Sequence, residues 1–258
     1  MSRKEHIMPL KESENYDNSG IYNNSIKFSS LSVATAFILI IEIGGRFLLN
    51  KIFALATPFS TIEKILILRI FQITFIICIT IYYKYDFEKI FGFKGPTLKK
   101  GLRTGLLWSF YFGIAAIVGA FMILYITRKN PLLFFNSPLV SNLLSSSSPN
   151  SKQFEVAIFM FTGCIVSPFA EELFFRGFIY SFFRKYGVTA ALIISTSIFL
   201  LCHISGSNSI NSALVIPFIG GIIFALSYEY SKSLVSPIII HSLGNTALFT
   251  INLLLICW

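Results

Sequence analysis

Seven apolar stretches, each about as long as a membrane-spanning helix, constrain this chain more than any other feature of its sequence. A helix needs about 20 mostly apolar residues to cross the hydrocarbon core of a bilayer. The stretches that qualify are residues 31–49, 65–83, 104–127, 154–170, 188–204, 213–230 and 234–257. The fourth runs into the charged segment SPFAEELFFRGFIYSFFRKYG, which favours a helix that leaves the bilayer or lies partly along its surface. The sequence therefore predicts an all-α, polytopic transmembrane helix bundle of about seven or eight spans.

The composition is that of a membrane protein and excludes an ordinary soluble enzyme. Hydrophobic residues make up 54% of the 258 residues and charged residues only 13%, against roughly 25% charged residues in a soluble domain. The formal net charge is +9, but the basic residues form short clusters between apolar runs and do not follow one amphipathic face. We therefore expect the positive charge to meet anionic membrane lipid and not nucleic acid.

The distribution of Lys and Arg in short loops predicts the orientation, because such residues stay in the cytoplasm. The connector after the second stretch, residues 84–103, carries six of them, whereas the connector that ends in SNLLSSSSPNSK carries three over a greater length. The first is expected inside and the second outside, which puts Arg184, Lys185 and Lys232 inside. The chain then divides into a cytoplasmic N-terminal tail (1–30), N-terminal transmembrane helices with an external loop (31–150) and a C-terminal core (151–258).

Ionisable and amide side chains recur in the stretches of the C-terminal core and at the end of the fourth stretch. Such groups are costly in hydrocarbon, so each needs a partner, a cavity or a function. The set consists of Glu171, Glu172, Arg176, His203, His241 and Asn245. A single histidine or asparagine in a span is more often an interhelical contact, but six such residues spread over three helices favour a functional site. Arg69, by contrast, is expected near a helix end, where its side chain can reach water.

Helix geometry divides the first three residues of this set into a pair and a free carboxylate. Residues four apart share a helix face, so Glu172 and Arg176 can form an ion pair, while Glu171 projects elsewhere and remains available as a general base. His241 and Asn245 also share a face, so both can donate hydrogen bonds toward one point.

The motifs EELFFRG (171–177), FLLCH (199–203) and HSLGN (241–245) resemble the EExxxR, FxxxH and HxxxN or HxxxD motifs of the CAAX-protease and bacteriocin-processing family, also called CPBP or Abi. Their order and spacing agree with that family over about residues 150–250. The resemblance implies that residues 151–258 are an intramembrane protease core. It also implies that Glu171 and His203 activate a water, that His241 and Asn245 form the oxyanion hole, and that Glu172 and Arg176 support them.

The resemblance leaves the use of a metal open, with a metal-free site favoured over a zinc site. Two histidines and a glutamate are adequate zinc ligands, but the chain has no HExxH motif. Asn245 is a poor zinc ligand and a good donor to an oxyanion. We therefore expect no cofactor, with zinc as the alternative.

The implied substrate is a membrane-bound or lipidated protein or peptide in a bacterial cell membrane, and bacteriocin processing is one such role. A non-catalytic membrane scaffold or a bacteriocin self-immunity protein is the main alternative, because it could keep the fold without turnover. A proton-coupled transporter is less favoured, since inverted repeats with paired broken helices are typical of transporters and the sequence shows none.

Overall fold

The structure is a computed structural model that describes residues 27–40, 61–127, 149–204 and 214–257. These residues form helices and connecting turns without a β-strand, which confirms the all-α fold. Most of the predicted tail (1–30) and of the serine-rich loop (141–152) lies outside the described residues. In chain order the helices are α2 (Phe28–Leu39), α4 (Thr61–Tyr82), α5 (Phe87–Phe91), α6 (Gly95–Thr127), α9 (Pro149–Phe161), η2 (Thr162–Val166), α10 (Ser167–Glu172), η3 (Leu173–Tyr180), α11 (Ser181–Phe183), η4 (Arg184–Tyr186), α12 (Val188–Ile204), α13 (Val215–Ser231) and α14 (Val235–Cys257).

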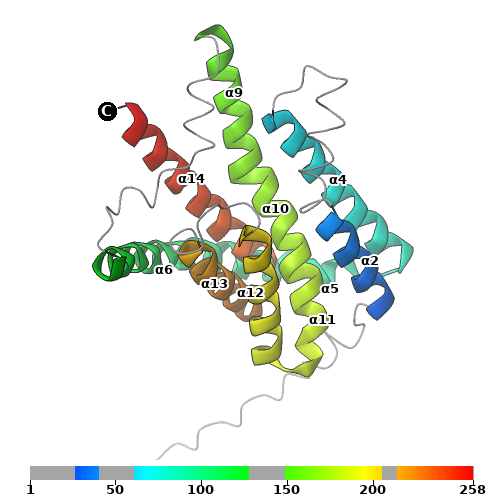
Figure 1. Cartoon of the computed structure of the whole chain (residues 1–258). Coiled ribbons are helices and arrows are strands. Elements are labelled where there is room, and N and C mark those ends of the chain that lie inside the picture. Colours follow the sequence, from blue (N-terminus) through cyan, green and yellow to red (C-terminus); the bar gives the residue numbers. More distant parts are fainter. Residues whose placement is uncertain (1–26, 41–60, 128–148, 205–213, 258) are drawn as a thin grey trace, which may run out of the picture.

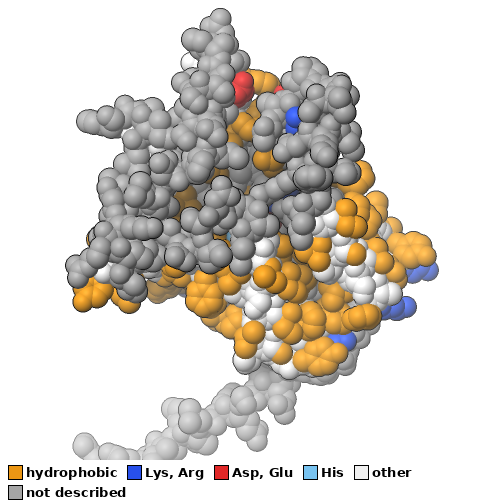
Figure 2. All heavy atoms as spheres, viewed as in Figure 1, with side chains coloured by type: hydrophobic (Ala, Val, Ile, Leu, Met, Phe, Trp, Pro, Cys, Tyr) orange, Lys and Arg blue, Asp and Glu red, His pale blue; other side chains and the backbone are white. Residues whose placement is uncertain are grey.

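Four helical segments of the described chain are long and apolar enough to cross a membrane: Ile62–Tyr82, Phe87–Met122, Gln153–Tyr186 and Val235–Leu254. Three shorter apolar helices are Phe28–Leu39, Val188–His203 and Val215–Ser231. These seven segments correspond one to one with the seven predicted stretches. Figure 2 shows hydrophobic side chains over most of the described surface on the visible face, with Lys and Arg near its right-hand and lower edges. The chain is therefore an integral membrane protein with several membrane helices.

The helix of the fourth stretch extends well beyond residue 170, where the apolar run was predicted to end. The chain continues as one helical rod from Pro149 to Phe183, through α9, η2, α10, η3 and α11 (Figure 1). Its charges do not end the helix, because Glu172 and Arg176 pair at 2.9 Å and their side chains are 0% exposed. The segment therefore adds no eighth span within residues 149–186.

The third stretch also begins earlier than predicted. Helix α6 starts at Gly95, so Lys99, Lys100 and Arg103 lie on its first turns and not in a connector. Long basic side chains can extend from a helix end to the membrane surface, which allows the helix to start before the apolar run.

The helices of the N-terminal half pack directly on those of the C-terminal half. Helix α6 packs against α13 and α14, α4 packs against η2 and α10, and α2 lies beside α4 (Figure 1). The core between η3, α12 and α13 is largely aromatic and includes Phe174, Phe178, Phe199, Phe224 and Tyr228. Packing of α4 on α10 brings a helix from the N-terminal half to the EExxxR segment.

A tight contact at Gly92 joins the basic region around α5 to the turn between α13 and α14. Gly92 has a φ of 61°, and a Cβ at this position would collide with the Lys232 carbonyl. The Leu234 amide donates to the Phe91 carbonyl at 2.9 Å, and the Ser233 hydroxyl donates to the Gly92 carbonyl at 2.7 Å. Glycine is required here because of both the left-handed backbone and the close approach.

The ion pairs of Glu229 extend this contact to the end of the long helical rod. Its carboxylate accepts from Arg184 at 2.9 Å and from Lys232 at 2.6 Å. Burial lowers the pKa of the Lys232 ammonium, and the hydrogen bond to Glu229 opposes that effect. The basic groups around α5, at residues 184–185 and at residue 232 therefore lie at one end of the protein, as the predicted alternation of spans requires.

Candidate active site

Glu171 and Glu172 lie in α10, a short α-helical segment between two π-helical segments, η2 and η3. Such π-helical insertions in α-helices occur frequently at functional sites, because they change the direction of the side chains that follow. Both π segments belong to the same rod, so the two carboxylates are held on a continuous element and not on a loop.

Glu172 connects three parts of the site through a single oxygen. Its Oε1 accepts from Arg176 Nη1 at 2.9 Å and from His241 Nδ1 at 2.9 Å. The predicted contact between Glu172 and Arg176 is thus present, and it extends to the HxxxN motif of α14. An ionised carboxylate only accepts hydrogen bonds, so the hydrogen of His241 in this contact lies on Nδ1.

Arg176 is enclosed by protein on all sides. Its side chain is 0% exposed, and Nη2 donates to the Gly221 carbonyl of α13 at 3.1 Å. The guanidinium carbon lies 4.9 Å from the Phe199 ring centroid and 5.2 Å from that of Phe224. A planar cation between aromatic faces is favourable, and it fixes the position of Glu172.

Glu171 is not the free carboxylate that the sequence predicts. Its Oε1 accepts from Arg69 Nη2 at 3.0 Å, with side chains 14% and 13% exposed. The prediction that Arg69 lies near a helix end and reaches water is also wrong, because α4 already begins at Thr61 and Arg69 faces α10.

The second oxygen of Glu171 faces the second nitrogen of His241. Glu171 Oε2 is buried and has no hydrogen-bond partner among the described residues, and it lies 3.9 Å from His241 Nε2. This separation is too long for a direct hydrogen bond but suits two groups that share a small polar reactant. The structure thus brings Glu171 and His241 together from different helices.

His203 lies beside this pair on α12. Its Nδ1 donates to the Phe199 carbonyl at 2.8 Å, so a neutral ring has its lone pair on Nε2. The His203 ring centroid is 4.3 Å from that of Phe199, which in turn is 6.1 Å from that of His241.

Asn245 makes a direct interhelical contact, in which Nδ2 donates to the Gly163 carbonyl of η2 at 2.8 Å. The cause lies in the helix that contains Gly163. In the π register the Ser167 amide bonds the Thr162 carbonyl, so the next donor would be the nitrogen of Pro168, which carries no hydrogen. The Gly163 carbonyl is therefore left without a partner in its own helix and accepts from Asn245.

The use of a metal at this site stays a prediction. Among the described residues, no group of three His, Cys, Asp or Glu side chains has the geometry to hold a metal ion. Arg176 and His241 Nδ1 contact Oε1 of Glu172, and Arg69 contacts Oε1 of Glu171.

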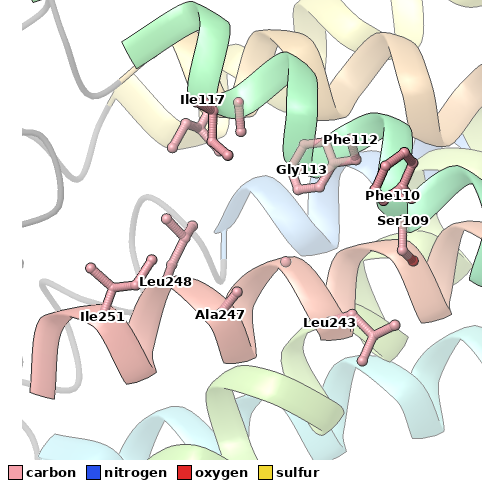
Figure 3. Close-up of a pocket in the computed structure, with 12 residues that line it drawn as sticks. Ser109, Phe110, Phe112, Gly113, Ile117, Leu243, Ala247, Leu248 and Ile251 are labelled. Carbon is pink, nitrogen blue, oxygen red and sulfur yellow. The ribbon is translucent and has the colours of Figure 1, made fainter. Parts of the chain in front are cut away.

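An apolar pocket of about 400 Å³ lies between α6 and α14, on another face of α14 from the motif residues. Figure 3 shows residues that line it, which include Phe112 and Gly113 of α6 and Leu243 and Ala247 of α14. None of the six predicted site residues lines it. The Phe112 ring packs on Phe224, which separates this pocket from His241.

Comparison with known proteins agrees with the motifs. Residues 153–247 match the family described as type II CAAX prenyl endopeptidase Rce1-like. This match confirms the resemblance of this part of the chain to the CAAX-protease family, which the three motifs indicate. The membrane-embedded CAAX protease MroQ of Staphylococcus aureus (strain USA300) is 34% identical over 112 residues, which cover 38% of this chain. The match spans 42% of that relative's length, and no solved structure matches the chain.

Sequence reasoning missed Arg69, which lies outside the three motifs and outside the residues matched by the family. Its only signal in the sequence is a cation inside an apolar stretch, and that signal does not say which residue it contacts. The contact depends on the packing of α4 against α10.

Proposed function

We propose that this chain is an intramembrane endopeptidase that hydrolyses a peptide bond of a membrane-associated or lipidated protein or peptide. The observation that carries the proposal is that the buried Glu171 Oε2 faces His241 Nε2 at 3.9 Å. They lie in a polar cluster built by α4, α10 and α14 inside an apolar helix bundle. The family match of residues 153–247 supports the choice of protease over other uses of such a cluster.

Glu171 Oε2 acts as the general base in the proposed reaction. It accepts a proton from water while the water oxygen bonds to the peptide carbonyl carbon, and the resulting tetrahedral intermediate carries an oxyanion. When the carbon–nitrogen bond breaks, the proton on Glu171 passes to the leaving amine. In this proposal His203 Nε2 holds the water, and the contact of Nδ1 with the Phe199 carbonyl supports this choice of nitrogen.

His241 and Asn245 supply the donors for the oxyanion. Glu172 occupies His241 Nδ1, so only Nε2 can face the reacting groups, and in this role Nε2 carries a hydrogen. Asn245 Nδ2 has two hydrogens, of which one goes to the Gly163 carbonyl and the other remains for the oxyanion. Donors fixed before reaction stabilise developing charge strongly in a water-poor site.

A non-catalytic scaffold or self-immunity protein is the second candidate. Glu171, Glu172, His241 and Asn245 all make contacts between helices, and a purely structural role would preserve such contacts. Catalytic turnover distinguishes the two candidates, because only a protease cleaves a peptide substrate.

The test is cleavage by the purified protein in liposomes, with a panel of membrane-anchored peptides that do or do not carry a prenylated cysteine near the C-terminus. In ¹⁸O-water, we expect one panel member to gain a single ¹⁸O at the new carboxyl group, detected by mass spectrometry. A chelator should leave the rate unchanged for the metal-free site and abolish it for the zinc alternative, with bound metal measured in parallel. A protein that supports its cellular role but cleaves no panel peptide would contradict the protease proposal and favour a scaffold.

A further inference from the structure

We infer that Arg69 of α4 is a positioning residue that orients the Glu171 carboxylate and balances its charge. The inference rests on the proposed function and adds to it a helix outside the family match of residues 153–247. It places part of the reaction machinery in the N-terminal half of the chain.

The location of Arg69 indicates that it serves a specific contact. It lies within the apolar span Ile62–Tyr82, where a cation is costly unless it has a partner. Its two terminal nitrogens make different contacts: Nη2 donates to Glu171 Oε1 at 3.0 Å and Nη1 donates to Gln72 Oε1 at 2.8 Å. Gln72 is only 2% exposed and lies one turn further along α4, so the guanidinium plane is held from two sides.

This contact gives the two oxygens of Glu171 different tasks. Arg69 occupies Oε1, while Oε2 is buried and faces His241 Nε2 at 3.9 Å. A carboxylate without such an anchor can rotate about its terminal bond, so either oxygen could point at the reactant or at neither. Arg69 therefore selects Oε2 as the reacting oxygen.

The charges of the site also indicate a role for Arg69, because each of the two glutamates pairs with its own arginine. Glu171 and Glu172 are neighbours, and Arg176 bonds Glu172 and the Gly221 carbonyl. Arg69 is the cation that directly bonds Glu171. Its removal would leave two buried carboxylates near one guanidinium, and like charges in a poorly solvated site repel strongly.

The decisive experiment compares Arg69→Met and Arg69→Lys with a matched control, Arg184→Met. Arg184 also pairs with a glutamate of another helix, Glu229, but outside the site. Cleavage of the panel peptide that the wild type hydrolyses fastest is measured in liposomes. We expect Arg69→Met to lower kcat by about 10- to 100-fold, as loss of a supporting partner does at other sites, with KM within about twofold. Arg69→Lys should recover part of kcat, because it restores the charge without the second hydrogen bond. Arg184→Met should lower the unfolding temperature and leave kcat unchanged.

A purely structural role for Arg69 would overturn the inference. It would appear as a kcat for Arg69→Met equal to that of the wild type. It would also appear as a loss of activity that matches the loss of folded protein and is shared by Arg184→Met.

A double-mutant cycle of stability, with Arg69→Met, Glu171→Gln and the double variant, adds a measurement that needs no turnover. Non-additive unfolding temperatures support the contact, and additive ones oppose it. Full cleavage by Glu171→Gln would refute the proposed function instead, and the stability cycle would still decide whether Arg69 holds Glu171.

Discussion

Glu172 accepts hydrogen bonds from Arg176 and His241 through the same oxygen, and its side chain is 0% exposed. Neutralising it leaves the buried guanidinium without its counter-ion. Loss of one partner from a buried pair costs about 3–5 kcal/mol, so we expect Glu172→Gln to destabilise the fold by that order. The measurement is denaturant-induced unfolding in detergent. Lys89→Gln, which removes an exposed pair with Asp86, is the control and should change stability by less than about 1 kcal/mol. Equal effects of the two substitutions would show that Glu172 is not needed to hold Arg176.

At the residue scale, contacts within one helix can be predicted from the sequence more reliably than contacts between helices. The pairing of Glu172 with Arg176 follows from four-residue spacing and is present at 2.9 Å. The pairing of Arg69 with Glu171 joins residues 102 positions apart. It could not be predicted, because only the packing of α4 on α10 brings them together. The proposed roles of Glu171, His203, His241 and Asn245 stay predictions that depend on turnover.

At the element scale, Pro168 interrupts the backbone hydrogen bonding of the rod that carries both glutamates. It leaves the Gly163 carbonyl without a donor from its own helix, and Asn245 donates to this carbonyl from α14 at 2.8 Å. Hydropathy predicted the helices themselves well. It misplaced the end of the fourth stretch and the start of α6, because it counts charges without knowing whether they are paired or lie at a helix end.

Substitution of Pro168 by alanine should separate stability from activity. The new amide of residue 168 can bond the Gly163 carbonyl, and the helix loses its least favourable residue. We therefore expect Pro168→Ala to unfold at an equal or higher temperature. Cleavage should fall up to about tenfold, since one hydrogen bond of net worth about 0.5–1.5 kcal/mol no longer holds Asn245. Pro237→Ala, in the first turn of α14, is the control and should leave cleavage unchanged. An unchanged rate in Pro168→Ala would show that the contact of Asn245 with Gly163 does not matter for the reaction.

At the scale of the whole molecule, the basic groups around α5, at residues 184–185 and at residue 232 gather at one end. The rule for basic loops predicts that this end is cytoplasmic, together with the N-terminus. We expect a cysteine at Lys99→Cys to resist a membrane-impermeant thiol reagent added to intact cells, and one at Ser147→Cys to react, in a variant without the native cysteines. The opposite pattern would reverse the orientation.

The central claim is that this membrane bundle hydrolyses peptide bonds with Glu171 as the base. The most direct measurement is the single-turnover rate of peptide cleavage in liposomes for the wild type, Glu171→Gln and the control Glu229→Gln, whose glutamate pairs with Arg184 and Lys232 away from the site. Removal of a general base costs about 10²–10⁴ in rate. We therefore predict a loss of that size for folded Glu171→Gln and a rate close to wild type for folded Glu229→Gln. Cleavage by Glu171→Gln at the wild-type rate would contradict the account.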